Sequence, residues 1–182
     1  MMDDQALLEL AVTLADQAGA VIRDIRARGF AQERKDDGSI VTEADNAAEA
    51  IIVAGLREAC PEIPVIAEEE VAGGRVTRAG ACFWLVDPLD GTREFAGGSD
   101  DFAVNIGLVR NGRVVLGAVG VPATGEMFGG IVGQGAWKRL NGQQTPVVSR
   151  EAPPEGLTVL ASRHHGDRAT LDAFLNGRPV AA

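Results

Sequence analysis

Apolar residues near the start of the chain recur at every third or fourth position, which is the period of an amphipathic helix. The pattern predicts one helix over about residues 4 to 27 and a second over about residues 42 to 59. The apolar positions are Leu7, Leu10, Leu14, Ala18, Val21 and Ile25 in the first helix and Ala48, Ile51, Ile52 and Leu56 in the second. Pro61 follows the second pattern and marks its end. Each helix therefore has one face to pack against another layer.

The middle of the chain changes to short apolar runs separated by turn residues, which is typical of strands. Strands are expected over residues 82–86, 102–109, 113–121, 127–132, 136–140 and 157–161. The pair Asn111-Gly112 joins two of them and is a strong signal for a tight hairpin. A short helix is expected over residues 168–175. The pattern predicts an α+β fold, with two N-terminal helices packed on a mainly antiparallel sheet, and residues 1–182 are interpreted as one domain.

Composition and charge are those of an ordinary globular protein. The 182 residues are 46% hydrophobic and 24% charged. A net charge of -9 argues against binding to a nucleic acid polymer, and a polyanionic substrate would need bound cations to reverse the local potential. Cys60 and Cys82 form no C-x-x-C motif and indicate a reducing cytoplasm. The amphipathic N-terminus does not have the form of a signal peptide, and no integral membrane segment is expected.

The segment Asp87-Pro88-Leu89-Asp90-Gly91-Thr92 carries the most informative chemistry of the chain. Its two carboxylates directly follow the apolar run Cys82–Val86, so the buried strand is expected to end there, with Pro88 stiffening a turn. Hard oxygen ligands of this kind favour Mg²⁺ over zinc. Exposed amides after Asp90 would favour an anion beside the metal if they open a helix. In isolation, however, Asp-Pro and Asp-Gly also occur in ordinary turns that have no chemistry.

Further acids lie upstream of this segment. Glu68-Glu69-Glu70 follows the short apolar run Pro64–Ala67, so it can bring another carboxylate to the end of a neighbouring strand. Such an acidic triplet is also typical of a solvated loop. Thr42 precedes the second helix and Asp45 lies three residues later, which has the form of a capping box with Asp in place of the usual Glu or Gln. A structural role and a catalytic role for Asp45 are compatible.

Other phosphate and metal motifs fit the sequence poorly. Phosphatases with a phospho-aspartate intermediate have their acids in a D-x-D-x-T pattern, whereas this chain has D-x-x-D-G-T and no strand at its start. An EF-hand calcium loop needs alternating ligands and a distal Glu, which are missing. No dinucleotide or P-loop fingerprint is formed by Gly91, Gly97 and Gly98, and no hydrolase elbow by Ser149 or Ser162.

Taken in order, the spaced motifs resemble the lithium-sensitive, magnesium-dependent phosphomonoesterases that include inositol monophosphatase and fructose bisphosphatase. The run Trp84–Phe95 is most similar to the 3'(2'),5'-bisphosphate nucleotidase branch, of the bacterial CysQ type. The resemblance extends from the first predicted helix to about Gly177. Its other segments are Lys35–Asp45, Val65–Glu69, Val104–Ile106, Gly135–Lys138 and Ser162–His165. It implies the sugar-phosphatase fold, a layered α/β/α/β/α architecture of which this chain would form the N-terminal portion.

The resemblance implies a role for each matching residue. The metal ligands would be Glu68, Asp87, Asp90 and the backbone carbonyl of Leu89. Thr92 and Asp45 would orient the attacking water, so the implied catalytic residues are Asp45, Glu68 and Thr92. The implied substrate contacts are Asp90, Gly91, Thr92, Arg93 and Arg163. Among these, the backbone amides of Gly91 and Thr92 would reach the phosphate, and the two arginines would offer planar donor forks to a second phosphate.

The implied activity is hydrolysis of the 3'-phosphate of adenosine 3',5'-bisphosphate to AMP and phosphate, linked to sulfate assimilation, with two or three Mg²⁺ ions. The partner would be a small phosphorylated nucleotide, and a homodimer is conceivable. The implied location is the cytoplasm, with a peripheral position on the cytoplasmic face of the inner membrane as a variant. One alternative is an inositol or sugar monophosphatase of the same fold. Another is a metal-binding fragment with little or no activity.

The fragment alternative rests on a departure from the family pattern. The resembling enzymes continue for roughly another third of their length into an α/β half, where a Trp-Asp motif supplies a further metal-binding carboxylate. Trp84 and Trp137 are the only tryptophans here, and neither precedes an aspartate. The chain is therefore expected to be truncated before that half and to be a poor catalyst.

Overall fold

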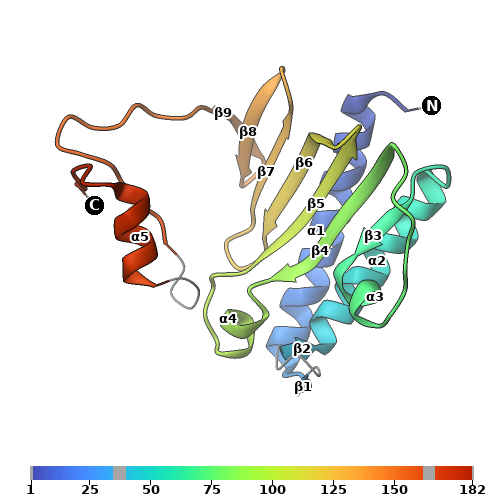
Figure 1. The fold of residues 1–182 in the computed structure, drawn as a ribbon. Coiled ribbons are helices and arrows are strands. Elements are labelled where there is room, and N and C mark those ends of the chain that lie inside the picture. Colours follow the sequence, from blue (N-terminus) through green and yellow to red (C-terminus); the bar gives the residue numbers. More distant parts are fainter. Residues whose placement is uncertain (1, 35–39, 162–166, 182) are drawn as a thin grey trace. The chain divides into compact units, whose positions relative to one another are not determined.

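Two long helices form one layer of the fold, and both follow the predicted apolar period. Helix α1 spans Asp4–Arg28, and its N-cap residue is Asp3, whose Oδ1 accepts a hydrogen bond from the Ala6 amide at 2.8 Å. Helix α2 spans Glu43–Ala59. This computed structural model describes residues 2–34, 40–161 and 167–181, and they divide into two compact units, residues 1–147 and 148–182. Both helices belong to the first unit (Figure 1).

A seven-stranded sheet forms the second layer of this unit, and its strands follow one another in chain order. The strands are β3 (Val65–Ala67), β4 (Cys82–Asp90), β5 (Ala103–Arg110), β6 (Arg113–Val121), β7 (Glu126–Ile131), β8 (Gly135–Leu140) and β9 (Gln143–Val147). Strands β3 and β4 are parallel, and every other neighbouring pair is antiparallel. The prediction of a mainly antiparallel sheet is therefore confirmed.

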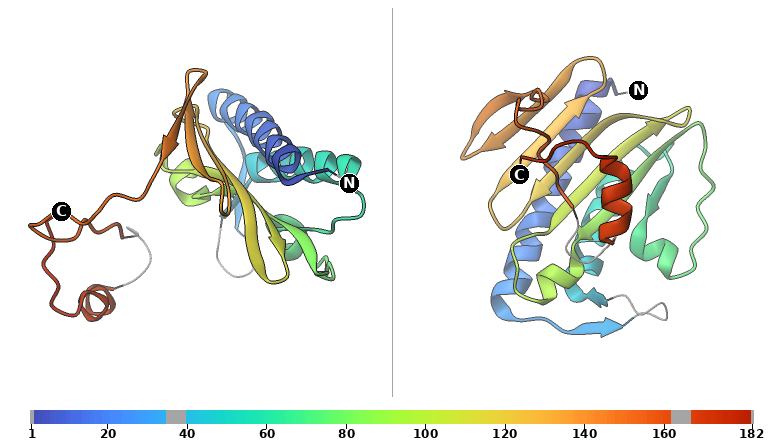
Figure 2. Two further views of the ribbon diagram at one scale, coloured as in Figure 1. Left: turned by 90° about the horizontal axis from the view of Figure 1, so that it is seen from above. Right: turned by 60° about the vertical axis from the view of Figure 1, so that its left-hand side comes forward.

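The hydrophobic core lies between the helices and one face of the sheet. Helix α1 packs against β5, β6 and β7, and α2 packs against β3 and β4; Figure 2 shows both helices on the same side of the sheet. Alternate strand residues face this layer because side chains along a strand point to opposite faces. Fully buried examples are Trp84, Val104, Ile106, Leu108 and Leu116. The opposite face of the sheet holds the intervening residues.

The end of β4 differs from the sequence-based expectation. The strand was expected to stop at Val86 and turn at Pro88, but it continues to Asp90. Its pairing with β5 shifts register between Asp87 and Asp90, which is a β-bulge. Pro88 is tolerated there because β3 ends opposite Val86, so no strand on that side needs its missing amide donor.

Several small elements were predicted incompletely. The hairpin at Asn111-Gly112 is confirmed, with positive φ angles of 54° and 73°. The last strand of the sheet, β9, was not predicted, and neither was the two-stranded ribbon of β1 (Gln32–Arg34) and β2 (Ile40–Thr42). Two five-residue helices, α3 (Glu68–Ala72) and α4 (Thr92–Ala96), follow β3 and β4.

Among its described residues, the second unit contains one helix, and it has the predicted length. Helix α5 spans Arg168–Leu175 and is capped by Asp167, whose Oδ1 accepts from the Thr170 amide at 2.8 Å. The strand predicted over residues 157–161 is wrong: Leu157 makes only a single parallel bridge to Val180, and residues 158–161 belong to no strand. An isolated apolar run forms a strand only if a partner is available to pair with it.

Helix α1 also passes a simple membrane-span test by its length of 25 residues and its hydropathy. Half of the most apolar 18-residue stretch of this helix is buried inside the protein. A core helix of a globular domain has the same length and composition, so the result by itself is weak evidence for a span.

Candidate active site

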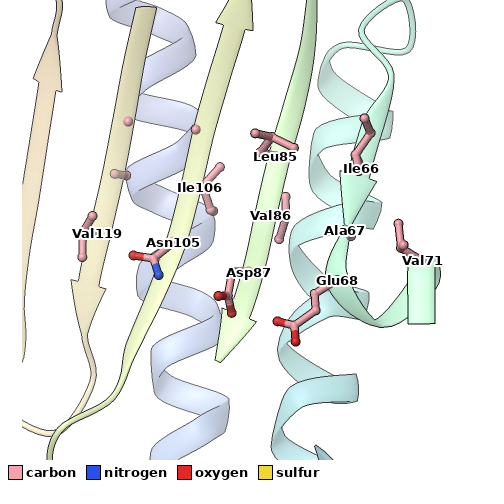
Figure 3. A pocket seen from close by; sticks show the side chains of 13 residues that line it. Ile66, Ala67, Glu68, Val71, Leu85, Val86, Asp87, Asn105, Ile106 and Val119 are labelled. Atoms are coloured by element: carbon pink, nitrogen blue, oxygen red, sulfur yellow. The ribbon is translucent and has the colours of Figure 1, made fainter. Parts of the chain in front are cut away.

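Two carboxylates meet where β3 and β4 run side by side. The parallel register pairs Ala67 with Val86, so the next residues, Glu68 and Asp87, leave the two strands at the same level. Glu68 is the exposed first residue of α3. The two carboxyl groups lie close enough to share a hydrogen bond when one of them holds a proton. Figure 3 shows both side chains at one end of the sheet.

The electrostatics of Asp87 indicate a site that lacks positive charge. Burial, followed by the negative charges of Glu68 and Asp90, raises the pKa of Asp87 to about 7, against a hydrogen bond from the Leu89 backbone that lowers it, because removing the proton leaves adjacent anions. Its Oδ1 atom is buried and has no hydrogen-bond partner among the described residues. An unpaired buried oxygen is costly, and a hard cation would satisfy it. The donor set of this pair therefore fits a divalent metal.

The bulge in β4 brings Asp90 to the same face of the sheet. Residues three apart on a regular strand point to opposite faces. Here Asp87 pairs with Asn105 and Asp90 pairs with Ala103, so one extra residue restores a common face. Asn105 confirms this geometry, since its Nδ2 donates to Asp90 Oδ2 at 3.2 Å. The bulge, rather than the turn expected at Pro88, therefore places Asp87 and Asp90 on one face of the sheet.

The acids do not form a ready metal-binding group. Within the described ranges, no set of three or more His, Cys, Asp or Glu side chains is arranged so that it could hold one ion. Glu68 and Asp87 are in contact, whereas Asp90 acts on Asp87 through its charge and is itself held by Asn105. The assignment of Glu68, Asp87, Leu89 and Asp90 as metal ligands stays a prediction.

A second acidic residue, Asp45, accepts hydrogen bonds at both of its carboxylate oxygens. Its Oδ2 accepts from the Thr42 amide at 2.8 Å and from the Thr42 hydroxyl at 2.6 Å, which completes the predicted capping box. Its Oδ1 accepts from the Thr92 hydroxyl at 2.8 Å. Asp45 is 1% exposed. The first turn of α2 is thereby joined to the first residue of α4, although 47 positions separate them in the chain.

Gly91 and Leu89 shape the backbone between Asp90 and Thr92. Gly91 has φ of 91°, and a Cβ atom there would lie 2.6 Å from the Asp101 carbonyl oxygen, so only glycine fits. The Thr92 hydroxyl also lies 2.9 Å from the Leu89 carbonyl oxygen. Its single proton serves one acceptor at a time, and the Asp45 carboxylate is the stronger one.

Sequence reasoning missed two residues that contact these elements. Glu49 of α2 is 6% exposed, and its carboxylate accepts from the backbone amides of Glu69 and Glu70 in α3 at 2.7 and 2.8 Å. Burial raises the pKa of Glu49, against the two amide hydrogen bonds that lower it. Asn105 was part of a matching segment but received no role. The available signals were an acid on the apolar face of a helix and an amide within an apolar strand.

Two predicted substrate contacts, Arg93 and Arg163, remain to be placed. Arg93 is exposed on α4. Arg163 lies outside the described residues, so its predicted role is untested. Beside the acids, a groove of about 550 Å³ runs over the sheet face that the helices leave open (Figure 3). Its apolar and small walls include Ile66, Leu85, Gly107, Gly117 and Val119, with Glu68, Asp87 and Asn105 among the lining residues.

Comparison with known proteins gives a consistent result. The model of the inositol monophosphatase family matches residues 3–178. The 3'(2'),5'-bisphosphate nucleotidase CysQ of Salmonella typhimurium is 39% identical over 90% of this chain and 67% of its own length. Inositol monophosphatase 3 of Solanum lycopersicum is 34% identical over 93% of this chain and 63% of its own length.

Comparison with a solved structure gives the same family. That of CysQ from Bacteroides thetaiotaomicron has a TM-score of 0.74 at 30% identity, covering 95% of this chain and 68% of the other. The chain thus spans about two thirds of the length of the proteins it matches.

Proposed function

This chain belongs to the inositol monophosphatase family, and from that premise we propose that it hydrolyses a phosphate monoester with Mg²⁺ as cofactor. The proposed substrate is adenosine 3',5'-bisphosphate, which would give AMP and phosphate. The observation that carries the proposal is the contact between Glu68 and Asp87, in which Asp87 Oδ1 is buried without a partner among the described residues. The bisphosphate substrate is supported by the 39% identity to a bisphosphate nucleotidase.

The residues proposed to hold Mg²⁺ are Glu68, Asp87, Asp90 and the Leu89 carbonyl. Carboxylate and carbonyl oxygens are the ligands that Mg²⁺ prefers. When bound, the ion neutralises the phosphate oxygens and stabilises the leaving oxygen. Asn105 holds Asp90 from β5, which limits the directions that this carboxylate can take. The number of ions stays a prediction.

Thr92 and Asp45 are proposed to orient the attacking water. Thr42 fixes Oδ2 of Asp45, so Oδ1 is left to accept the Thr92 hydroxyl proton. The lone pairs of Thr92 Oγ1 then accept a hydrogen bond from water and aim the water oxygen at phosphorus. Attack by the water oxygen forms a new P–O bond and breaks the bond to the 3' oxygen, and the two protons of the water end on the released phosphate and on the 3' oxygen.

The residues proposed to contact the substrate follow the bulge of β4 in the chain. Gly91 allows the phosphate to approach the backbone amides of Gly91 and Thr92 closely. Arg93 and Arg163 are proposed to bind the second phosphate. A cytoplasmic location and a homodimer also stay predictions, as does the expectation that this chain turns over slowly.

An inositol monophosphatase is the second candidate, because the tomato relative with that name is 34% identical over 93% of this chain. Both candidates predict the same metal-dependent chemistry. They differ in the second phosphate, which the inositol substrate lacks. A preference for the bisphosphate therefore requires the arginines to contribute.

The test is release of inorganic phosphate by the purified chain from adenosine 3',5'-bisphosphate and from inositol monophosphate, with Mg²⁺ and with a chelator. We expect Mg²⁺-dependent release that is faster for the bisphosphate, and none from Asp90→Asn. Arg163→Ala should chiefly raise KM. Equal or faster release from inositol monophosphate would support the second candidate, and chelator-resistant release would contradict the proposed chemistry.

A further inference from the structure

Glu49 makes two hydrogen bonds that the proposed chemistry does not use. Its carboxylate leaves α2 and reaches the first turn of α3, where Oε2 accepts from the Glu69 amide at 2.7 Å and Oε1 from the Glu70 amide at 2.8 Å. Each oxygen thus serves one backbone donor of the same turn. With only 6% of its surface exposed, Glu49 is one of the few buried charged residues of the described chain.

Helix α3 depends on this contact because it lacks a cap of its own. It has five residues, and its N-cap residue, Ala67, makes no side-chain hydrogen bond to the first turn. The first amides of a helix have no partner within the helix, and a single turn is unstable in isolation. Glu49 supplies from another helix the acceptors that a Ser, Thr or Asp cap would have supplied.

A second link joins the same two helices. Arg57 of α2 pairs with Glu70 through two hydrogen bonds, at 2.8 and 2.7 Å. A hollow of about 320 Å³, lined by Glu49, Arg57, Glu70 and small residues of α2, lies beside this link. Two sets of polar contacts, those of Glu49 and those of Arg57, therefore help to fix where the turn sits on α2.

The position of this turn determines the position of Glu68. Glu68 is the first residue of α3, immediately before the two amides that Glu49 binds. Rotation of the turn would carry the Glu68 carboxylate away from Asp87, with which it is in contact. A displacement of about 1 Å is enough to impair a metal site or a catalytic geometry.

We propose that Glu49 is a positioning residue for the candidate metal site: by capping α3 from α2, it holds the Glu68 carboxylate beside Asp87. The inference rests on the proposed function, since it concerns the same metal site. Glu49 does not line the groove beside Glu68 and Asp87, so the proposed role is exerted through α3. Its removal should weaken metal binding while leaving the fold in place, because water can reach the exposed side of α3.

The experiment compares the wild-type chain with Glu49→Ala and Glu49→Gln, measuring Mg²⁺ affinity by calorimetry and melting temperature in chelator. Partners that orient a metal ligand change affinity by about 10–100-fold when they are removed. We expect a loss in that range for Glu49→Ala. Glu49→Gln should fall between, because its amide oxygen can still accept one of the two backbone donors. In variants with turnover, half-maximal activity should require correspondingly more Mg²⁺.

Asp3→Ala is the matched control, because Asp3 also caps a helix but lies on α1. It should lower the melting temperature and leave Mg²⁺ affinity unchanged. Equal affinity of the wild type and both Glu49 variants would overturn the inference alone. An equal loss of affinity in Asp3→Ala would also overturn it, since the effect would then be general destabilisation. Absence of Mg²⁺ binding by the wild type would overturn the proposed metal site together with the inference. If Glu49→Ala does not fold, the comparison is made with Glu49→Gln.

Discussion

Asp45 and Asp87 occupy two neighbouring regions of the same site, yet the protein treats their carboxylates in opposite ways. At the start of α2, the oxygens of Asp45 accept three hydrogen bonds from Thr42 and Thr92. At the end of β4, Asp87 faces the carboxyl of Glu68, and its Oδ1 has no donor within the described part of the chain. One region is satisfied by the protein itself, whereas the other needs a proton or a cation.

This difference in hydrogen bonding suits the two regions to different roles. A carboxylate whose oxygens are held by fixed donors keeps one orientation and can orient a neighbouring hydroxyl, as Asp45 does for Thr92. A carboxylate held against another one is destabilised by their repulsion. A bound cation relieves this repulsion, and the relief adds to the free energy of cation binding. The first region is preorganised by hydrogen bonds, and in the proposed site a bound cation would complete the second.

Between the two compared carboxylates, the larger expected effect is that of Asp87→Asn. The amide cannot replace an anionic metal ligand, and losing several kcal/mol of transition-state stabilisation lowers turnover on the order of a thousandfold or more. The metal-free variant should nevertheless be as stable as the wild type or more stable, because the repulsion from Glu68 is removed. Phosphate release and chemical denaturation check both parts, and a variant that is clearly less stable without metal would contradict the comparison.

Asp45→Asn should have a smaller effect on turnover and the opposite effect on stability. Its amide nitrogen, if turned toward Thr42, would face a donor, so the capping box would lose about 1 kcal/mol. Misorientation of Thr92 should lower turnover by roughly a hundredfold, the lower end of general acid-base effects. Mg²⁺ affinity should change little. Thr42→Ala is the control, since it removes the cap and leaves the Asp45 contact with Thr92.

The pH dependence should also separate the two regions. The pKa of Asp87 is raised to about 7, so between about pH 4 and 7 the folded chain holds a proton that the unfolded chain releases. Raising the pH through this window should therefore lower the free energy of unfolding of the metal-free protein. Mg²⁺ binds the deprotonated carboxylate, so its stabilising effect should grow over the same window. Melting temperatures with and without Mg²⁺ test this, and Asp87→Asn should flatten the difference.

The sequence predicted those parts of the fold that depend on local pattern. The periods of α1 and α2 and the Asn111-Gly112 hairpin are properties of adjacent residues, and all three are confirmed. The strand over residues 157–161 was wrong because pairing requires a distant partner. The polar edge strand β9 was missed for the converse reason, since its partner β8 induces it without an apolar signal.

The candidate site was predictable to the same extent. The capping box of Thr42 and Asp45 is local and is confirmed. The bulge at Asp87 to Asp90 could not be read from the sequence, because a register shift exists only relative to β5. The link from Glu49 to α3 depends on how two helices pack, which the spacing of acids along the chain does not encode.

The smallest expected effect is that of Asn105→Ala, which tests how much the neutral amide donor beside the acids contributes to Mg²⁺ affinity. Asn105 gives one hydrogen bond of 3.2 Å to the exposed Asp90 carboxylate. Such a bond contributes about 1 kcal/mol or less, and water can replace it, so Mg²⁺ affinity should fall by no more than about fivefold. Asn46→Ala is the matched control, because its amide also donates one long bond, 3.3 Å, but to the backbone carbonyl of Thr42 at the start of α2. It should leave affinity unchanged. A loss for Asn105→Ala as large as that for Asp87→Asn would mean that the second region is also preorganised by the protein, and the contrast with Asp45 would then fail.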